Sequence, residues 1–145
     1  RPVSAKHRKG NGVSVAKWLH FPHLGDERGQ LFAMEGARSI PFEIKRVYYM
    51  TGMKPDLPRG FHAHRALRQV VVCVAGRCRI VLDDGERRDS IWLDSPAKGL
   101  LIDRSVWREM HDFREDCVLV VLASDYYDEA DYIRSYEEFL AMVRR

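Results

Sequence analysis

Short apolar segments alternate with turn residues along most of the chain. Apolar side chains at every second position, or in short continuous runs, are typical of strands. We predict strands at 13–19, 29–35, 44–50, 70–74, 77–82, 90–93, 99–102 and 117–123. Ala75 and Gly76 predict a tight hairpin between the two strands that flank them, and Asp83 to Gly85 predicts another turn. Many short strands joined by turns indicate an all-β sandwich or barrel.

The last part of the chain has a different period. Between Asp128 and Arg144, apolar side chains recur at helical spacing. They are Tyr132, Ile133, Tyr136, Phe139, Leu140 and Val143. Acidic residues lie early in this segment and arginines end it, which suits the dipole of a helix. We predict a helix over this segment that packs its aromatic stripe on the barrel or on a partner subunit.

Length and charge indicate a single domain. The chain has 145 residues and a net charge of +3, which suits one hydrophobic core. We expect residues 1–12 to form a flexible basic segment and residues 13–145 to form the domain. No apolar run approaches the roughly 20 residues that span a bilayer, and no signal peptide is visible. Because the sequence begins at Arg1, it leaves open that the chain is a fragment of a longer protein.

The cysteines and the basic residues exclude several classes of protein. An odd number of cysteines, Cys73, Cys78 and Cys117, with no short-spaced pair, argues against a disulfide framework or a zinc ribbon. Each lies in or beside a predicted strand, so we expect core residues in a reducing cytoplasm. The sequence has no basic helix and no aromatic-plus-basic strand of the RNA-binding type. We therefore predict no nucleic-acid partner and no membrane association.

Two histidines one residue apart, His62 and His64, carry the clearest chemical signal. On a strand, residues two apart point to the same face, with Cβ atoms roughly 7 Å apart. Two imidazoles that face one cavity indicate either a metal site or an acid/base pair. The preceding segment, Thr51 to Arg59, is interrupted by prolines, and we predict a loop that faces the substrate.

The residues that follow the histidine pair argue against a metal. The stretch from Gly60 through His62 and His64 to Gln69 resembles the first motif of the cupin superfamily. In metal-binding cupins the Gln69 position is usually Glu, and a later His completes the site. Arg108 stands where that later His is expected. An arginine does not deprotonate, so it cannot be a ligand, and its charge repels a divalent cation. We predict no metal and no other cofactor, and an acid/base role for the histidines near neutral pH.

Six runs of sequence resemble one family of cupins, the thymidine-diphosphate-sugar 3,4-ketoisomerases. The runs are 41–49, 58–64, 81–85, 93–96, 107–113 and 122–128. They cover most of residues 25 to 140, in order. The resemblance implies an all-β cupin fold, a jelly-roll or β-barrel with a short C-terminal helix. It implies a metal-free homodimer in which the subunits commonly exchange N-terminal strands. It also implies a role in bacterial deoxysugar biosynthesis, for example for the O-antigen of lipopolysaccharide or S-layer glycans.

The activity that the resemblance implies is the isomerisation of a thymidine-diphosphate 4-keto-6-deoxyglucose to the 3-keto sugar. By this resemblance, His62 and His64 are the acid/base pair. A base removes the C3 proton beside the C4 ketone to give an enediol, and a proton returned to C4 leaves the ketone at C3. Charge on the enediol oxygens needs hydrogen-bond donors already in place. Tyr48, Gln69 and Arg79 are the candidate donors.

The nucleotide of such a substrate predicts further contacts. Arg46 and Arg59 are candidates for the diphosphate, because a forked guanidinium binds two phosphate oxygens at once. Trp107 is a candidate for stacking on thymine, although its position equally suits core packing. His111 is either a substrate contact or a hydrogen-bonded support. Arg108 stands where close relatives tend to have His, and it is a candidate for contact with a phosphate or a hydroxyl.

The turn at Arg28 and Gly29 bears on stereochemistry. Enzymes of this family make either the 3-keto-6-deoxygalactose product or its gluco epimer, depending on the face on which C4 is reprotonated. Arg28 and Gly29 resemble the corresponding residues of the galacto-forming branch. We therefore expect the galacto product, with Arg28 as a substrate-binding residue.

Three alternative functions remain open from the sequence. A thymidine-diphosphate-sugar 3,5-epimerase is also a metal-free cupin, but it pairs a His with an Asp and a Tyr acid, whereas this chain offers His-x-His. A non-catalytic sugar-binding cupin needs no acid/base pair. A metal-dependent cupin oxygenase or isomerase requires stoichiometric metal and loses activity on chelation.

Overall fold

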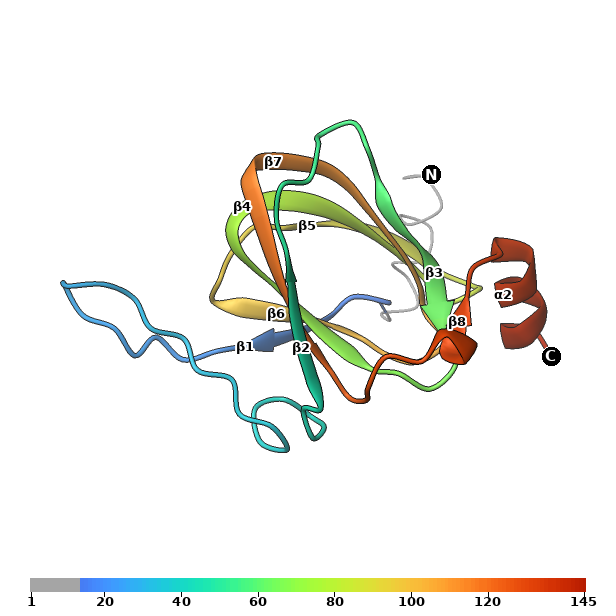
Figure 1. Ribbon diagram of the computed structural model, residues 1–145, viewed down its shortest axis with the longest axis horizontal. Helices are drawn as coiled ribbons and strands as arrows, with labels where there is room; N and C mark the ends of the chain where they lie inside the picture. Colours follow the sequence, from blue (N-terminus) through green and yellow to red (C-terminus); the bar gives the residue numbers. More distant parts are fainter. Residues whose placement is uncertain (1–13) are drawn as a thin grey trace.

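The computed structural model describes residues 14–145, and the basic segment predicted at 1–12 lies outside the described residues. Strands dominate, and the sheet curls into a barrel (Figure 1). The strands are β1 Lys17–His20, β2 Arg46–Met50, β3 Arg59–His64, β4 Gln69–Asp83, β5 Arg88–Leu93, β6 Lys98–Ile102, β7 Trp107–Ala123 and β8 Tyr132–Ile133. A 3-10 turn η2 (Glu129–Asp131) and a helix α2 (Tyr136–Val143) follow β7. The predicted all-β cupin fold with a short C-terminal helix is confirmed.

Two long strands organise the sheet. β4 and β7 run antiparallel along almost their whole lengths, from Gln69 opposite Ala123 to Asp83 opposite Trp107. β2 and β3 pair with β7, whereas β5 and β6 pair with β4. β1 adds to β6, and the short β8 adds to β3. All these pairs are antiparallel. Because β3 pairs with β7, the histidines on β3 lie beside β7.

The hairpin predicted at Ala75 and Gly76 is wrong, because β4 continues through these residues as one strand. Gly76 has a φ of +68°, in the left-handed region that favours glycine. A Cβ at Gly76 would clash with the carbonyl oxygen of Arg114 on β7. The register between β4 and β7 shifts around this point. Gly76 therefore marks an irregularity that bends the paired strands, and the barrel curls there.

The barrel interior holds the main hydrophobic core. The three cysteines are free and buried in it, as predicted. Ile80 and Leu82 of β4 and Met110 of β7 also point inward. Because side chains alternate across a strand, the residues next to them in sequence point to the outer face. Within residues 14–145, no helix is long and apolar enough to cross a membrane.

The predicted C-terminal helix is shorter than expected. Residues 128–135 form a turn, η2 and β8, and α2 begins only after Ser135, whose side chain accepts a hydrogen bond from the backbone N–H of Glu138. α2 packs Phe139 on the outer face of the barrel against Trp107 and Ala63. The helical period in the sequence holds for α2, whereas β8 leaves it to extend the sheet next to β3.

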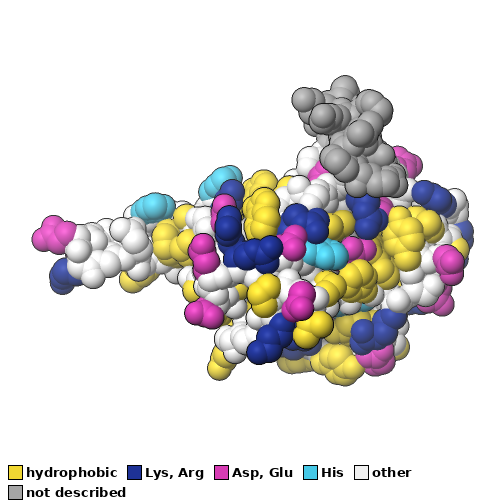
Figure 2. Space-filling model, turned by 90° about the horizontal axis from the view of Figure 1, so that it is seen from above, with side chains coloured by type: hydrophobic (Ala, Val, Ile, Leu, Met, Phe, Trp, Pro, Cys, Tyr) yellow, Lys and Arg dark blue, Asp and Glu magenta, His cyan; other side chains and the backbone are white. Residues whose placement is uncertain are grey.

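The strand predicted at 29–35 is also wrong. Residues 22–31, which we call the N-terminal arm, are all exposed and carry only an isolated bridge between Asp26 and Gly29. The arm projects away from the barrel in two views at right angles (Figures 1 and 2). Leu24 and Leu31 on the arm are more than half exposed. Figure 2 also shows basic and acidic side chains interspersed on the face that it presents.

The packing of α2 predicts the effect of Phe139→Ala. Phe139 is fully buried between α2 and the outer face of the barrel, and truncation of a buried Phe costs about 3–5 kcal/mol. We expect a loss of this size in the free energy of unfolding, measured by urea denaturation. The exposed Glu137→Gln on the same helix serves as the control and should change stability by less than about 0.5 kcal/mol. Equal stability of the two variants would contradict this packing.

Candidate active site

A bulge in β3 sets the direction of the histidines. The register between β3 and β7 shifts between Gly60 and His62, and Phe61 has a φ of +61°, which is strained for an aromatic residue. After the bulge, His62 lies directly opposite Arg108 on β7. Cross-strand neighbours share one face of the sheet. His62 and Arg108 therefore both point into the barrel, and His64 follows on the same face.

The two imidazoles and Tyr132 form one aromatic cluster. The ring centroids of His62 and His64 are 5.0 Å apart, in an edge-on arrangement. The ring of Tyr132 lies 4.9 Å from His62 and 4.3 Å from His64. Tyr132 reaches this position because β8 pairs it with His64. The pair of rings expected from the sequence is thus present, and a tyrosine packs against both.

Arg108 lies in the barrel with no anionic partner. Its side chain is 1 % exposed. Nη1 donates to Oε1 of Gln69 at 2.6 Å, and Nη2 donates to the carbonyl oxygen of Val106 at 3.1 Å. Nε has no partner, and Arg108 takes part in no ion pair within residues 14–145. Nε2 of Gln69 in turn donates to the hydroxyl of Tyr48 at 2.9 Å.

Burial and Arg108 determine the protonation of the histidines. Burial lowers the pKa of His62 to about 4, and the charge on Arg108 adds to this effect. The same two causes, in the same order, lower the pKa of His64 to about 2. Burial lowers the pKa of Arg108 to about 10, so that it still carries its charge at neutral pH. Both imidazoles are then neutral bases beside a fixed cation.

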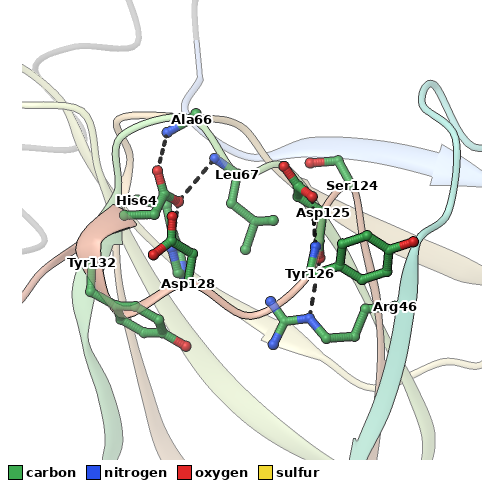
Figure 3. Close-up of a pocket in the computed structure, with 10 residues that line it drawn as sticks. Arg46, His64, Ala66, Leu67, Ser124, Asp125, Tyr126, Asp128 and Tyr132 are labelled. Carbon is green, nitrogen blue, oxygen red and sulfur yellow. Dashed lines mark hydrogen bonds and ion pairs between the residues drawn. The ribbon is translucent and has the colours of Figure 1, made fainter.

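Two cavities open beside this cluster. The larger, about 740 Å³, adjoins His62, Tyr48 and Tyr132 and has Arg46, Arg59 and Arg134 around it. The smaller, about 140 Å³, adjoins His64 and shares Arg46 and Tyr132 with the larger one. Figure 3 shows His64 and Tyr132 on one side of this smaller cavity and Arg46, Asp125 and Tyr126 on the other. We call them the large cavity and the small cavity.

Three predicted site residues lie elsewhere. Arg79, Trp107 and His111 lie on the outer face of the barrel, opposite to the face that carries the histidine pair. Arg79 forms an ion pair with Asp112, and His111 hydrogen-bonds to Glu109. Trp107 is buried beneath α2, which is the core-packing alternative that its position left open. These placements give no support for a role of the three side chains in substrate binding.

Arg28 is also distant from the histidine pair. It lies on the N-terminal arm, is mostly exposed, and forms an ion pair with Asp26 at 2.6 Å. By contrast, the structure brings Arg46, Tyr48, Arg59, Gln69 and Arg108 together around the histidines.

The sequence missed the side chains that η2 and β8 supply. Tyr132 and Arg134 border the large cavity, and Asp131 contacts His64. The sequence predicted a helix from Asp128 onward, so it gave no sign that β8 pairs with β3. The only local signal was the three acidic residues, Asp128, Glu129 and Asp131, near a predicted helix start.

The donor set does not suit a divalent metal. Within residues 14–145, no group of three His, Cys, Asp or Glu side chains is placed to hold one. The guanidinium of Arg108 also lies across from His62, where its charge would repel a divalent cation. The arrangement instead offers two neutral imidazoles, a phenol and a buried cation, which suits proton transfer with stabilisation of a developing anion.

Comparisons with known proteins agree with this site. The family model described as "FdtA: WxcM-like, C-terminal" matches residues 14–144. A TDP-4-oxo-6-deoxy-alpha-D-glucose-3,4-oxoisomerase from Aneurinibacillus thermoaerophilus is 57% identical over 129 residues, which are 89% of this chain and 93% of that protein.

Solved structures show the same similarity. A 3,4-ketoisomerase from Helicobacter canadensis is 51% identical, with a TM-score of 0.86, and the match covers 90% of this chain and 98% of that one. A mutant of the 3,4-ketoisomerase QdtA from Thermoanaerobacterium thermosaccharolyticum, solved with TDP-4-keto-6-deoxyglucose, is 43% identical, with a TM-score of 0.87. That match covers 91% of this chain and 96% of the other.

The electrostatics of the site predict the effect of Arg108→Met. Removal of the cation should raise the pKa of both His62 and His64, although burial should keep each below the ordinary value near 6.5. We expect unchanged or greater stability at neutral pH, because an unpaired buried charge is replaced by an apolar side chain. NMR titration of the imidazoles measures the pKa values. Arg77→Met, which removes an exposed charge on the outer face, should leave them unchanged.

The same shifts fix the sign of the pH dependence. Between pH 4 and 6.5 the unfolded chain binds more protons at these histidines than the folded protein, so the wild type should lose stability as the pH falls below about 6.5. Arg108→Met should lose less stability over this range. Histidine pKa values that do not change in Arg108→Met would contradict the assigned role of the cation.

Proposed function

Because this chain belongs to the FdtA family and is an isomerase of the sugar 3,4-ketoisomerase type, we propose that it acts on TDP-4-keto-6-deoxyglucose and moves the keto group from C4 to C3. The observation that carries this proposal is the pair of neutral imidazoles, His62 and His64, beside the buried cation of Arg108. Relatives named for this activity support the choice of substrate.

The large cavity suits a nucleotide sugar. Its volume of about 740 Å³ is within the range of small-molecule sites. Arg59 makes no ion pair within residues 14–145 and is the strongest candidate for the diphosphate. Arg46 is the other candidate for the diphosphate. It lies over the ring of Tyr48, and its Nε donates to the carbonyl oxygen of Asp125, so it also orders the wall of the cavity.

The proposed reaction is an internal transfer of hydrogen. A histidine takes the proton from C3 as the electrons of the C3–H bond form a C3–C4 double bond, and the C4 oxygen gains a proton to give the enediol. The 3-hydroxyl then loses its proton as a proton returns to C4, which leaves the ketone at C3. Electrons and protons balance within the sugar, so no external oxidant or reductant is needed.

The donors around the pair suit the enediol. Arg108 is a fixed positive charge in a site that excludes water, where it stabilises a developing oxyanion far more than it would in water. Gln69 links Arg108 to Tyr48, so the phenol and the guanidinium are held by one hydrogen-bond chain. Burial raises the pKa of Tyr48, which keeps its proton available for donation.

The alternative functions are less favoured. The relatives that are 57%, 51% and 43% identical are named 3,4-oxoisomerase or 3,4-ketoisomerase, which favours this activity over a 3,5-epimerase. A sugar-binding cupin would have no need to keep two neutral imidazoles beside a buried cation. Stoichiometric metal in the purified protein, or loss of activity on chelation, would contradict the proposal and favour a metal-dependent cupin.

The stereochemistry and the assembly are proposed together. We propose the galacto product and a homodimer that exchanges N-terminal strands. The N-terminal arm supports a dimer, because it carries exposed apolar side chains and projects away from the barrel. Arg28 on this arm could therefore contact the histidine pair of a second copy, but not the pair of its own chain. The H4 coupling constants of the product test the stereochemistry, and the gluco pattern would contradict it. A monomeric mass in sedimentation equilibrium would contradict the dimer.

The cellular setting follows from the same assignment. The proposed product is an intermediate for deoxysugars such as those of the O-antigen, and three free, buried thiols suit a reducing cytoplasm. Recovery of the protein outside the cytoplasmic fraction would contradict this location.

The acid/base assignment predicts the behaviour of His62→Asn and His64→Asn. Each variant should lose about 10²–10⁴-fold in kcat, because proton transfer by a positioned side chain contributes that much. Affinity for TDP, measured by calorimetry, should persist, since the diphosphate contacts lie elsewhere. Conversion to the 3-keto sugar is followed by proton NMR. His20→Asn, at the exposed end of β1, is the matched control. Wild-type turnover in both site variants would contradict the assignment.

A further inference from the structure

Nδ1 of His64 lies 3.1 Å from Oδ2 of Asp131, a residue that the sequence did not single out. The imidazole is buried, and the Asp131 side chain is 17 % exposed. The other ring nitrogen of His64, Nε2, is buried and has no hydrogen-bond partner in the part of the chain that the structure describes. A buried polar atom without a partner is rare in a folded protein and indicates a catalytic or ligand-binding role.

The surroundings of Asp131 show which atom donates in this contact. Oδ1 accepts a hydrogen bond from the backbone N–H of Ala66 at 2.8 Å, and Oδ2 accepts one from the backbone N–H of Leu67 at 3.2 Å. Both carboxyl oxygens are thus acceptors that already face donors. The hydrogen between Asp131 and His64 must therefore belong to Nδ1. A neutral imidazole carries one hydrogen, so the lone pair is then on Nε2.

We propose that Asp131 is a positioning residue that holds His64 as the Nδ1–H tautomer, with Nε2 as a proton acceptor for the substrate. The inference rests on the proposed function for its catalytic meaning. During enediol formation, a proton leaves the substrate and bonds to the Nε2 lone pair, whereas the Nδ1 proton stays on Nδ1. The imidazolium that results is stabilised by the carboxylate, and it is neutral again when Nε2 gives up this proton to groups of the site that exchange with solvent.

The backbone holds Asp131 in place independently of His64. Its carbonyl oxygen accepts from the N–H of Arg65 at 2.9 Å, and its own N–H donates to the carbonyl oxygen of Asp128 at 3.0 Å. β8, which follows directly, pairs with β3 at His64. The segment therefore clamps the turn after β3 at several points, and the carboxylate is fixed before the substrate arrives. Such preorganisation is what a tautomer-selecting residue requires.

A purely structural role for Asp131 would be to tie the turn at residues 65–67. The test must therefore read the tautomer itself. Long-range nitrogen–proton NMR of histidine-labelled protein reports which ring nitrogen of His64 carries the hydrogen. In the wild type we expect it on Nδ1. In Asp131→Asn we expect the hydrogen to shift to Nε2, because the amide group presents a donor to Nδ1.

Asp131→Asn should then lose about 10²–10⁴-fold in kcat with little change in KM, as expected when a base has the wrong tautomer. Asp116→Asn is the control, since it removes one negative charge from an exposed position on β7 that borders neither cavity. Its kcat and its tautomer should equal those of the wild type. Thermal unfolding of each variant shows whether the fold is retained.

A second variant, Asp131→Ala, keeps the proposal testable if Asp131→Asn does not fold. Asp131→Ala leaves space for a small carboxylate, and added formate should restore part of its kcat. Formate should have no such effect on Asp131→Asn, in which the amide fills the site.

The outcomes separate the two proposals. A wild-type tautomer with the hydrogen on Nε2, or normal kcat in Asp131→Asn despite a shifted tautomer, overturns the role of Asp131. If His64 shows the expected tautomers but the wild type makes no 3-keto sugar, the proposed function is overturned, whereas the positioning of His64 by Asp131 stands.

Discussion

The site is organised around one buried cation, Arg108, that no carboxylate within residues 14–145 neutralises. Arg108 is held in the barrel by Gln69 and a backbone carbonyl, with Nε left free. An isolated charge in a protein interior costs on the order of several kcal/mol. A fold retains such a cost where it serves function, and here burial keeps His62 and His64 neutral, with the charge of Arg108 adding to this effect. In the proposed reaction, stabilisation of the enediol oxyanion depends on that charge, whereas the neutral state of the imidazoles depends first on their burial.

The C-terminal segment completes this arrangement from outside the barrel. α2 covers the outer face at Phe139, which anchors β8 next to β3. β8 then places Tyr132 against both imidazoles, and the preceding residue, Asp131, contacts His64. The site is therefore built from strands distant in sequence, β2, β3, β4 and β7, and closed by the last turn and strand of the chain. Tyr132 borders both the small cavity and the large cavity.

The sequence predicted the barrel and the inner half of the site because both follow from local pattern. Period-two runs gave most strands, and the spacing of His62 and His64 gave their common face. The hairpin at Gly76 was wrong because a glycine signals a positive φ without saying whether the chain reverses or only bends. Arg79, Trp107 and His111 could not be assigned to the outer face without the register of β4 and β7. Asp131 and Tyr132 were hidden by a helical period that α2 obeys and β8 does not.

The most direct test of the account is to incubate wild-type protein, with metal chelated, with TDP-4-keto-6-deoxyglucose in D₂O and to follow the sugar by proton NMR. The account predicts a new 3-keto sugar with deuterium at C4, because the proton that returns to C4 comes from groups that exchange with solvent. Exchange at C3 and C5 with the ketone still at C4 would contradict it and indicate an epimerase. An unchanged sugar that remains bound would contradict it as well and indicate a binding protein.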